Sequence, residues 1–477
     1  MEARSSTRRY LPTPRPRLLL IMLPGTMLLA ALICSTQLPN LLLNPIASIC
    51  APLLVMGALA MLWLGTRPEM PPWTIRLWAA LPRQLRSPML RTIIVTPLIL
   101  LGLSTLARST YFYLDTAPYT ADAIAYLHID ADAILHGKNP YTQQNSIWDA
   151  ALRWPKESGT PMIRGKLAGC AICYPASAKL TTLMQDEAHN PAHRHGEYDP
   201  ATAHNYPAGS LWMVLPIVWA GGVSIVWLNY LATFLMILLV LLRSTRSLRP
   251  VIIAGLLCAT IAFSTNFDAI SLVFVLAAWH WRDHRLMSPI LLGWACAVKQ
   301  IAWFFVPFYL IEVGRREGWR AAGIRGLWLG IVFIVPNLPF IIADPHAWVA
   351  SQLVPMSDPM FPSGMGFVAP SLSGVIPLWP PIVYTALEFT AWVGLAFYQL
   401  RRKAITSDGL LLALMPLFFA RRDLINYIAL VPLIALWLVC DNAQRRERAA
   451  LVATPVTSSS ETEQQPKHAV AGDAALA

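Results

Sequence analysis

The fold class is decided by residues 286–313, which read LMSPILLGWACAVKQIAWFFVPFYLIEV. The stretch is apolar on both sides of a polar centre formed by Lys299 and Gln300, and basic clusters flank it. Lys and Arg collect in cytoplasmic loops, so both flanks are expected on the same side of a membrane. A chain that leaves one side and returns to it forms a hairpin, whose tip is expected at Lys299 and Gln300.

The composition indicates a chain that lies mostly in lipid. Of its 477 residues, 56% are hydrophobic and 13% are charged, and the mean hydropathy is +0.49. Soluble domains contain about 25% charged residues. The net charge of +11 is assigned to cytoplasmic loops that orient the chain in the membrane. A nucleic-acid partner is therefore not expected.

The hairpin pattern recurs through the C-terminal half. Five basic clusters punctuate it, at 243–249, 282–285, 315–325, 401–403 and 445–448. If all five lie in the cytoplasm, the outward tips between them fall at 266–268, 299–300, 344–372 and 421–423. Several hairpin arms are shorter than the about 20 residues of a full crossing. The tips are therefore expected below the outer surface, where charged groups line a polar cavity.

The N-terminal half completes the predicted topology. Basic segments before and after the first two apolar runs leave a large polar loop outside the membrane, between the third and fourth spans. The next apolar run begins with a half-span at 207–220 that is broken at Gly221 and Gly222. We predict an all-α polytopic membrane protein with about twelve transmembrane helices. Its parts are a cytoplasmic basic tail at 1–17, the first three spans at 18–109, the outer loop at 110–205, the remaining helices at 206–441 and a disordered cytoplasmic tail at 442–477.

The start of the outer loop holds the candidate catalytic residues. Residues 111–141 read YFYLDTAPYTADAIAYLHIDADAILHGKNPY, with Asp115 and Asp122 nearest the membrane. Tyr126 and Gly137 follow at intervals that fit a helix ending in a turn.

This stretch resembles the first outer loop of GT-C superfamily glycosyltransferases, especially polyprenol-phosphate-mannose-dependent mannosyltransferases. The resemblance rests on an Asp, three residues and a Tyr, followed by a helix that closes in G-x-N-P-Y. It extends over roughly 92–440 and includes NYPAGSLWMVLP, NFDAISLVFVLA and LLGWACAVKQIAWFFVPF. The chain has Tyr206, Pro207 and Ala208 where the family often has Tyr-Pro-Pro, and its segment 142–205 is longer.

The resemblance implies a membrane glycosyltransferase that moves a hexose, mannose in the nearest group, from polyprenyl phosphate to a hydroxyl of a lipid or glycan acceptor. The site would face outward and the anomeric carbon would invert. Asp122 matches the general base, and Asp115 is the second candidate. Lys299, Arg421 and Arg422 would bind the leaving phosphate. The predicted substrate-binding residues are Tyr126, Tyr141, Tyr206, Asp268 and Gln300.

Several of these residues also have a plainer interpretation. Asp122 would serve as the cap of a helix over 123–136, and Asp115 would start the turn DTAP. Lys299 would snorkel from a helix end, and the two arginines would anchor a turn. Asp268 would position Lys299 or bind a divalent cation.

Other functions remain open at this point. A secondary transporter or lipid flippase would also contain broken spans and buried charges, and a non-catalytic subunit of an envelope assembly would need no base. No nucleotide-binding motif of the G-x-x-x-x-G-K-[ST] or G-x-G-x-x-G type occurs in the chain. Cys170 and Cys173 form no second pair for zinc, and the histidine-rich run 186–199 matches no specific metal motif.

Overall fold

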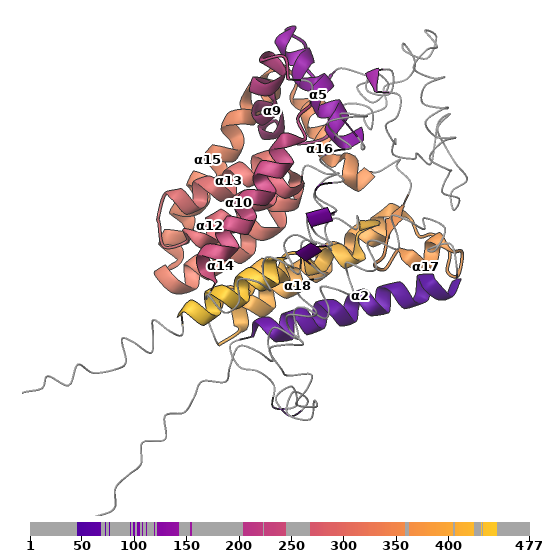
Figure 1. Cartoon of the computed structure of the whole chain (residues 1–477), viewed down its shortest axis with the longest axis vertical. Coiled ribbons are helices and arrows are strands. Elements are labelled where there is room, and N and C mark those ends of the chain that lie inside the picture. Colours follow the sequence, from indigo (N-terminus) through magenta and orange to yellow (C-terminus); the bar gives the residue numbers. More distant parts are fainter. Residues whose placement is uncertain are drawn as a thin grey trace, which may run out of the picture.

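The computed structural model describes a mostly helical protein (Figure 1). The described residues are 45–67, 122–142, 204–222, 224–244, 268–357, 362–403, 406–423 and 433–445, with isolated positions between 72 and 154 and at 431. The α-helices are α2 (Pro45–Thr66), α5 (Asp122–Leu135), α9 (Gly209–Trp219), α10 (Trp227–Arg243), α12 (Asp268–His280), α13 (Met287–Val298), α14 (Phe305–Glu317), α15 (Trp319–Ala343), α16 (Pro345–Ser357), α17 (Ala369–Leu372), α18 (Pro381–Arg401) and α19 (Gly409–Leu412). Two 3-10 helices, η4 (Gln300–Phe304) and η5 (Met415–Phe419), and two strands, β1 (Ser363–Gly364) and β2 (Arg422–Asp423), are also present, and residues 433–445 are helical.

Helices α10, α12, α13, α14 and α15 pack into a bundle, which lies on the left side of the molecule in Figure 1. Helix α13 packs between α12 and α15, and α14 also packs on α15. A Cβ atom on Gly293 would lie 2.6 Å from the carbonyl oxygen of Leu329, so only glycine permits the close approach of α13 and α15.

The chain breaks predicted from the sequence are confirmed at two positions. Helix α13 ends at Val298 and η4 begins at Gln300, which places the polar centre of the hairpin between two helices. Helix α9 ends at Trp219, and Gly221 follows with a φ of 74°. This left-handed conformation favours glycine and separates α9 from α10.

The region 344–372 differs from the predicted loop. It contains α16 and α17, and β1 lies between them. Strand β1 pairs in parallel with β2, so the predicted tip at 421–423 is joined to this region through backbone hydrogen bonds. Two-residue strands are too short to show the alternation by which a strand is recognised in a sequence.

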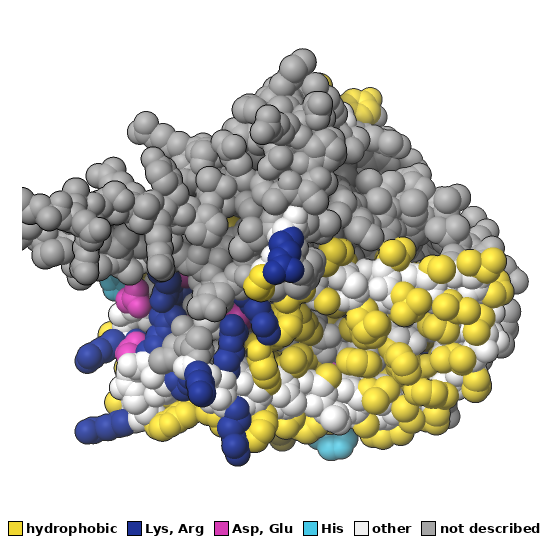
Figure 2. All heavy atoms as spheres, turned by 90° about the horizontal axis from the view of Figure 1, so that it is seen from below, with side chains coloured by type: hydrophobic (Ala, Val, Ile, Leu, Met, Phe, Trp, Pro, Cys, Tyr) yellow, Lys and Arg dark blue, Asp and Glu magenta, His cyan; other side chains and the backbone are white. Residues whose placement is uncertain are grey.

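Two described helices, Ser48–Thr66 and Trp319–Ala343, are long and apolar enough to cross a membrane by length and composition. The shorter apolar helices of the described chain have 10–17 residues. The predicted span 18–37 lies outside the described residues, and so does most of 92–109. Large apolar side chains are exposed on α10, α15 and α18. Figure 2 shows a broad apolar face with Lys and Arg side chains gathered at one end.

The five basic clusters predicted from the sequence meet at one end of the bundle. Asp441 forms ion pairs with one arginine from each of three clusters. These are Arg243 of the first cluster at 3.5 Å, Arg282 of the second at 2.7 Å and Arg445 of the fifth at 3.0 Å. The third cluster joins them because Arg325 donates to the carbonyl oxygen of Arg282 at 2.6 Å.

The fourth cluster joins the same end through Arg315, whose guanidinium donates to the carbonyl oxygen of Lys403 at 3.1 Å. Residues that are far apart in sequence, but similar in charge, are thus brought to one side of the molecule.

Candidate functional site

One side of the site is built on α5. The helix begins at Asp122, and Gly137 follows it with a φ of 71°, which confirms the predicted helix that ends in a turn. Asp122, Tyr126 and Asp130 are spaced four residues apart, so they lie along one stripe of the helix. The side chain of Asp122 and the whole of Asp115 lie outside the described residues. The roles of base and cap therefore both stay predictions.

Tyr126 on α5 contacts the segment that precedes α9. The hydroxyl of Tyr126 donates to Asn205 Oδ1 at 2.6 Å, and the Tyr126 ring stacks on the Tyr206 ring with centroids 5.7 Å apart. The hydroxyl of Tyr141 donates to the carbonyl oxygen of Tyr206 at 2.8 Å. Three predicted substrate-binding tyrosines are therefore in contact.

Lys299 approaches Tyr206 from the break between α13 and η4. Its Nζ lies 4.9 Å from the centroid of the Tyr206 ring, a distance typical of a cation–π contact. The same ammonium forms an ion pair with the carboxylate of Asp268, at the start of α12. Only 4% of the Lys299 side chain and 2% of the Asp268 side chain are exposed. A snorkelling lysine keeps its ammonium in water, so this burial argues against snorkelling.

Gln300 connects the hairpin tip to the same segment. Its Nε2 donates to the carbonyl oxygen of Asn205 at 2.6 Å and to Gln352 Oε1 on α16 at 3.1 Å. Gln352 in turn donates to the carbonyl oxygen of Tyr206 at 3.2 Å. We call the six predicted residues joined in this way the Tyr206 cluster; they are Tyr126, Tyr141, Tyr206, Asp268, Lys299 and Gln300.

A close approach of α9 to α13 keeps this segment beside the hairpin tip. A Cβ atom on Gly209 would lie 2.5 Å from the carbonyl oxygen of Ala297, two residues before Lys299. The backbone N–H of Ala208 donates to Asn337 Oδ1 on α15 at 2.8 Å. The GT-C family often has a second proline at the position of Ala208. Proline has no backbone N–H, so only a residue such as Ala208 can donate this hydrogen bond.

The contacts described for Arg421 and Arg422 are with β1. Both follow η5, and the carbonyl oxygen of Arg421 accepts from the backbone N–H of Ser363 at 3.3 Å. Arg422 pairs with Ser363 in the strand register, and Arg421 is buried. A phosphate site shared by Lys299 and both arginines stays a prediction.

Two histidines, His128 on α5 and His204 beside it, are not among the site residues predicted from the sequence. His204 Nδ1 lies 2.8 Å from Asp130 Oδ2, and both side chains are fully buried. His128 Nδ1 lies 2.5 Å from the Tyr119 hydroxyl. Burial, together with the positive charge of Arg153, lowers the pKa of His128 to about 4, so its imidazole is neutral near pH 7. In the sequence, only the position of Asp130, four residues after Tyr126, points to the pair of Asp130 and His204.

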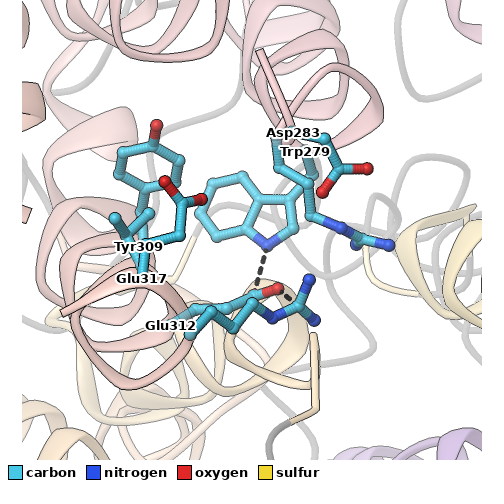
Figure 3. A pocket seen from close by; sticks show the side chains of 8 residues that line it. Trp279, Asp283, Tyr309, Glu312 and Glu317 are labelled. Atoms are coloured by element: carbon cyan, nitrogen blue, oxygen red, sulfur yellow. Dashed lines mark hydrogen bonds and ion pairs between the residues drawn. The ribbon is translucent and has the colours of Figure 1, made fainter. Parts of the chain in front are cut away.

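A pocket lies at the end of the bundle where the basic clusters meet. Figure 3 shows the Trp279 indole directed toward Glu312, with Tyr309 and Glu317 nearby. Glu312 accepts from Trp279 Nε1 at 3.1 Å, from the Ser407 hydroxyl at 2.9 Å and from Arg316 at 2.8 Å. Both carboxylate oxygens are therefore occupied, and we interpret the pocket as part of a structural link between α12 and α14.

The described residues contain no group of three or more His, Cys, Asp or Glu side chains that could hold a metal ion. Cys170, Cys173 and the run 186–199 lie outside the described residues.

A comparison with known proteins finds no matching family model, no similar curated protein and no similar solved structure. The function of the chain is therefore inferred from its own residues.

Proposed function

We propose that the chain is a polytopic membrane glycosyltransferase. It moves a hexose from a polyprenyl-phosphate donor to an acceptor hydroxyl on the extracytoplasmic face of a cell membrane. The observation that carries the proposal is the Tyr206 cluster. Its members come from five separate segments of the sequence, and the resemblance to GT-C enzymes implies for each of them a substrate-binding or phosphate-binding role.

The chemistry of the cluster suits a lipid-phosphate donor. A phosphodiester gains negative charge when its sugar leaves, and a fixed cation in a poorly screened place stabilises that charge. Lys299 supplies such a cation, because Asp268 and the Tyr206 ring fix its ammonium away from solvent. Asp122 precedes Tyr126 by one helical turn of α5 and is the proposed base.

The arrangement of charge supports an outward-facing site. The Tyr206 cluster includes Asp268, the first residue of α12, whereas the basic clusters meet near His280, its last residue. Lys and Arg mark the cytoplasmic side in membrane proteins. The cluster would then lie toward the opposite side, where a lipid-linked sugar donor is available without a nucleotide.

The test is transfer from a synthetic short-chain polyprenyl-phosphate hexose in detergent. Asp122→Asn is expected to lower the rate by about a hundredfold to ten-thousandfold, because an amide keeps the shape but cannot accept the proton. The matched control is Asp132→Asn on the same helix, whose side chain is 43% exposed and which should leave the rate unchanged. Unchanged turnover in Asp122→Asn, or equal use of a nucleotide sugar by the parent protein, would favour a transporter or lipid flippase.

A further inference from the structure

The buried pair of Asp130 and His204 is not needed for any role assigned above. Asp130 extends from the third turn of α5, and its Oδ2 lies 2.8 Å from Nδ1 of His204. The backbone of His204 is held as well, because its N–H donates to the carbonyl oxygen of Pro140 at 3.3 Å and its own carbonyl oxygen accepts from the Ser351 hydroxyl. The imidazole is thus fixed both in position and in orientation.

The other ring nitrogen of His204, Nε2, is buried. Nε2 has no hydrogen-bond partner among the described residues, although the side chain is fully buried. An unsatisfied buried polar atom is costly, so such atoms in native proteins call for an explanation. A hydroxyl group fits Nε2 in either protonation state, since a hydroxyl both donates and accepts hydrogen bonds.

The surroundings of His204 favour a ligand that has apolar faces as well as hydroxyls. Three tyrosine rings surround the imidazole, with centroid distances of 6.0 Å for Tyr126, 5.1 Å for Tyr141 and 6.0 Å for Tyr206. The Tyr126 and Tyr141 hydroxyls already donate to Asn205 and Tyr206. The aromatic rings provide apolar surface, and Nε2 provides a single directed polar atom, a combination found in ligand sites.

We propose that His204 binds a hydroxyl group of the hexose through Nε2, with Asp130 as the residue that positions the imidazole. This inference rests on the proposed function and assigns the sugar, rather than the phosphate, to the His204 side of Tyr206. Lys299 and His204 both contact the Tyr206 ring. One aromatic residue would therefore lie next to both parts of a sugar phosphate.

The decisive variant is His204→Asn. The shorter amide can still donate to Asp130 from near the Nδ1 position, but it has no atom at the position of Nε2. We would measure the Kd of a short-chain polyprenyl-phosphate hexose and of the same lipid phosphate without the sugar. The parent should prefer the sugar-bearing lipid, and His204→Asn should reduce this preference about tenfold, the effect of one lost hydrogen bond. The matched control is His136→Asn, since His136 also bonds through Nδ1 but is exposed.

A second measurement uses the parent protein alone and does not depend on the folding of a variant. Among monodeoxy analogues of the hexose lipid, one should bind about tenfold more weakly than the intact sugar, because it lacks the hydroxyl that meets Nε2. That analogue should show no further loss in His204→Asn. Equal binding of all the analogues by the parent would overturn the inference.

The outcomes separate the inference from the function on which it rests. An unchanged sugar preference in His204→Asn, or an equal loss for both lipids, would make His204 a structural residue and leave the glycosyltransferase proposal standing. Equal binding of both lipids by the parent would instead reject the hexose donor, and with it both proposals.

Discussion

Lys299 and Asp268 carry opposite charges at a place where both side chains are almost fully buried. Removing two charges from water costs free energy. Their mutual attraction offsets this cost only when the geometry of the pair is good. A well-packed apolar pair at the same place would often be as stable or more stable. The presence of the ions is therefore more easily explained by a role in function than by a gain in stability.

The variants Lys299→Met and Lys299→Arg test this role. Methionine keeps most of the length of lysine but removes the charge, so the rate of transfer should fall by about two to three powers of ten if the ammonium stabilises the leaving phosphate. Arginine should retain part of the rate. The measurement is turnover at saturating donor in detergent.

The double variant Asp268→Leu with Lys299→Met controls for damage to the fold. Lys299→Met alone leaves a buried carboxylate unpaired, which is itself destabilising. The double variant removes that problem, so it should be at least as thermally stable as Lys299→Met while still lacking activity. Recovery of activity in the double variant would mean that the pair is structural only.

At the scale of the elements, the sequence predicts the positions of breaks better than the contacts between helices. A polar pair inside an apolar run identifies the end of α13, and two glycines identify the end of α9. The pairing of β1 with β2 depends on residues distant in sequence, which local patterns do not report. The same holds for Gly293, whose contact with Leu329 exists only because α13 and α15 pack together. Helix α16 does have a local signal, because Asp344 Oδ1 accepts from the backbone N–H of Ala347 at 2.9 Å and Pro345 opens the helix.

The substitution Gly293→Ala tests this helix contact. The added methyl would lie 2.6 Å from the carbonyl oxygen of Leu329, so α13 and α15 must move apart, and overpacking of this kind typically costs about 1–3 kcal/mol. Gly330→Ala is the matched control on α15, since a Cβ there meets nothing within 4 Å. Thermal unfolding in detergent should show a lower Tm for Gly293→Ala alone. Equal Tm values for the two variants would contradict the close approach.

In the whole molecule, the length of α12 sets the distance between the two polar ends of the bundle. One end holds the Tyr206 cluster, and the other holds the basic clusters. A helix of 13 residues is about 20 Å long, whereas the hydrocarbon core of a membrane is about 30 Å thick. If the basic clusters lie at the cytoplasmic surface, the Tyr206 cluster lies about 10 Å below the opposite surface. The sequence predicts this placement from its short hairpin arms, but not which residues meet there. The Asp130–His204 pair joins positions 74 residues apart, and the spacing of Asp130 from Tyr126 indicates only one of its two members.

The predicted orientation is tested by labelling single cysteines in a chain whose seven native cysteines have been replaced. Lys138 lies in the turn after α5 and Lys403 follows α18; both are exposed, and they lie toward the two opposite polar ends of the bundle. If the basic end is cytoplasmic, a membrane-impermeant maleimide should label Lys138→Cys in intact cells, and it should label Lys403→Cys only after the membrane is opened. The opposite pattern would invert the protein in the membrane and place the Tyr206 cluster on the cytoplasmic side, where a nucleotide sugar would be the more accessible donor. Labelling of both positions in intact cells would mean that no membrane separates the two ends, and the polytopic topology would then be wrong.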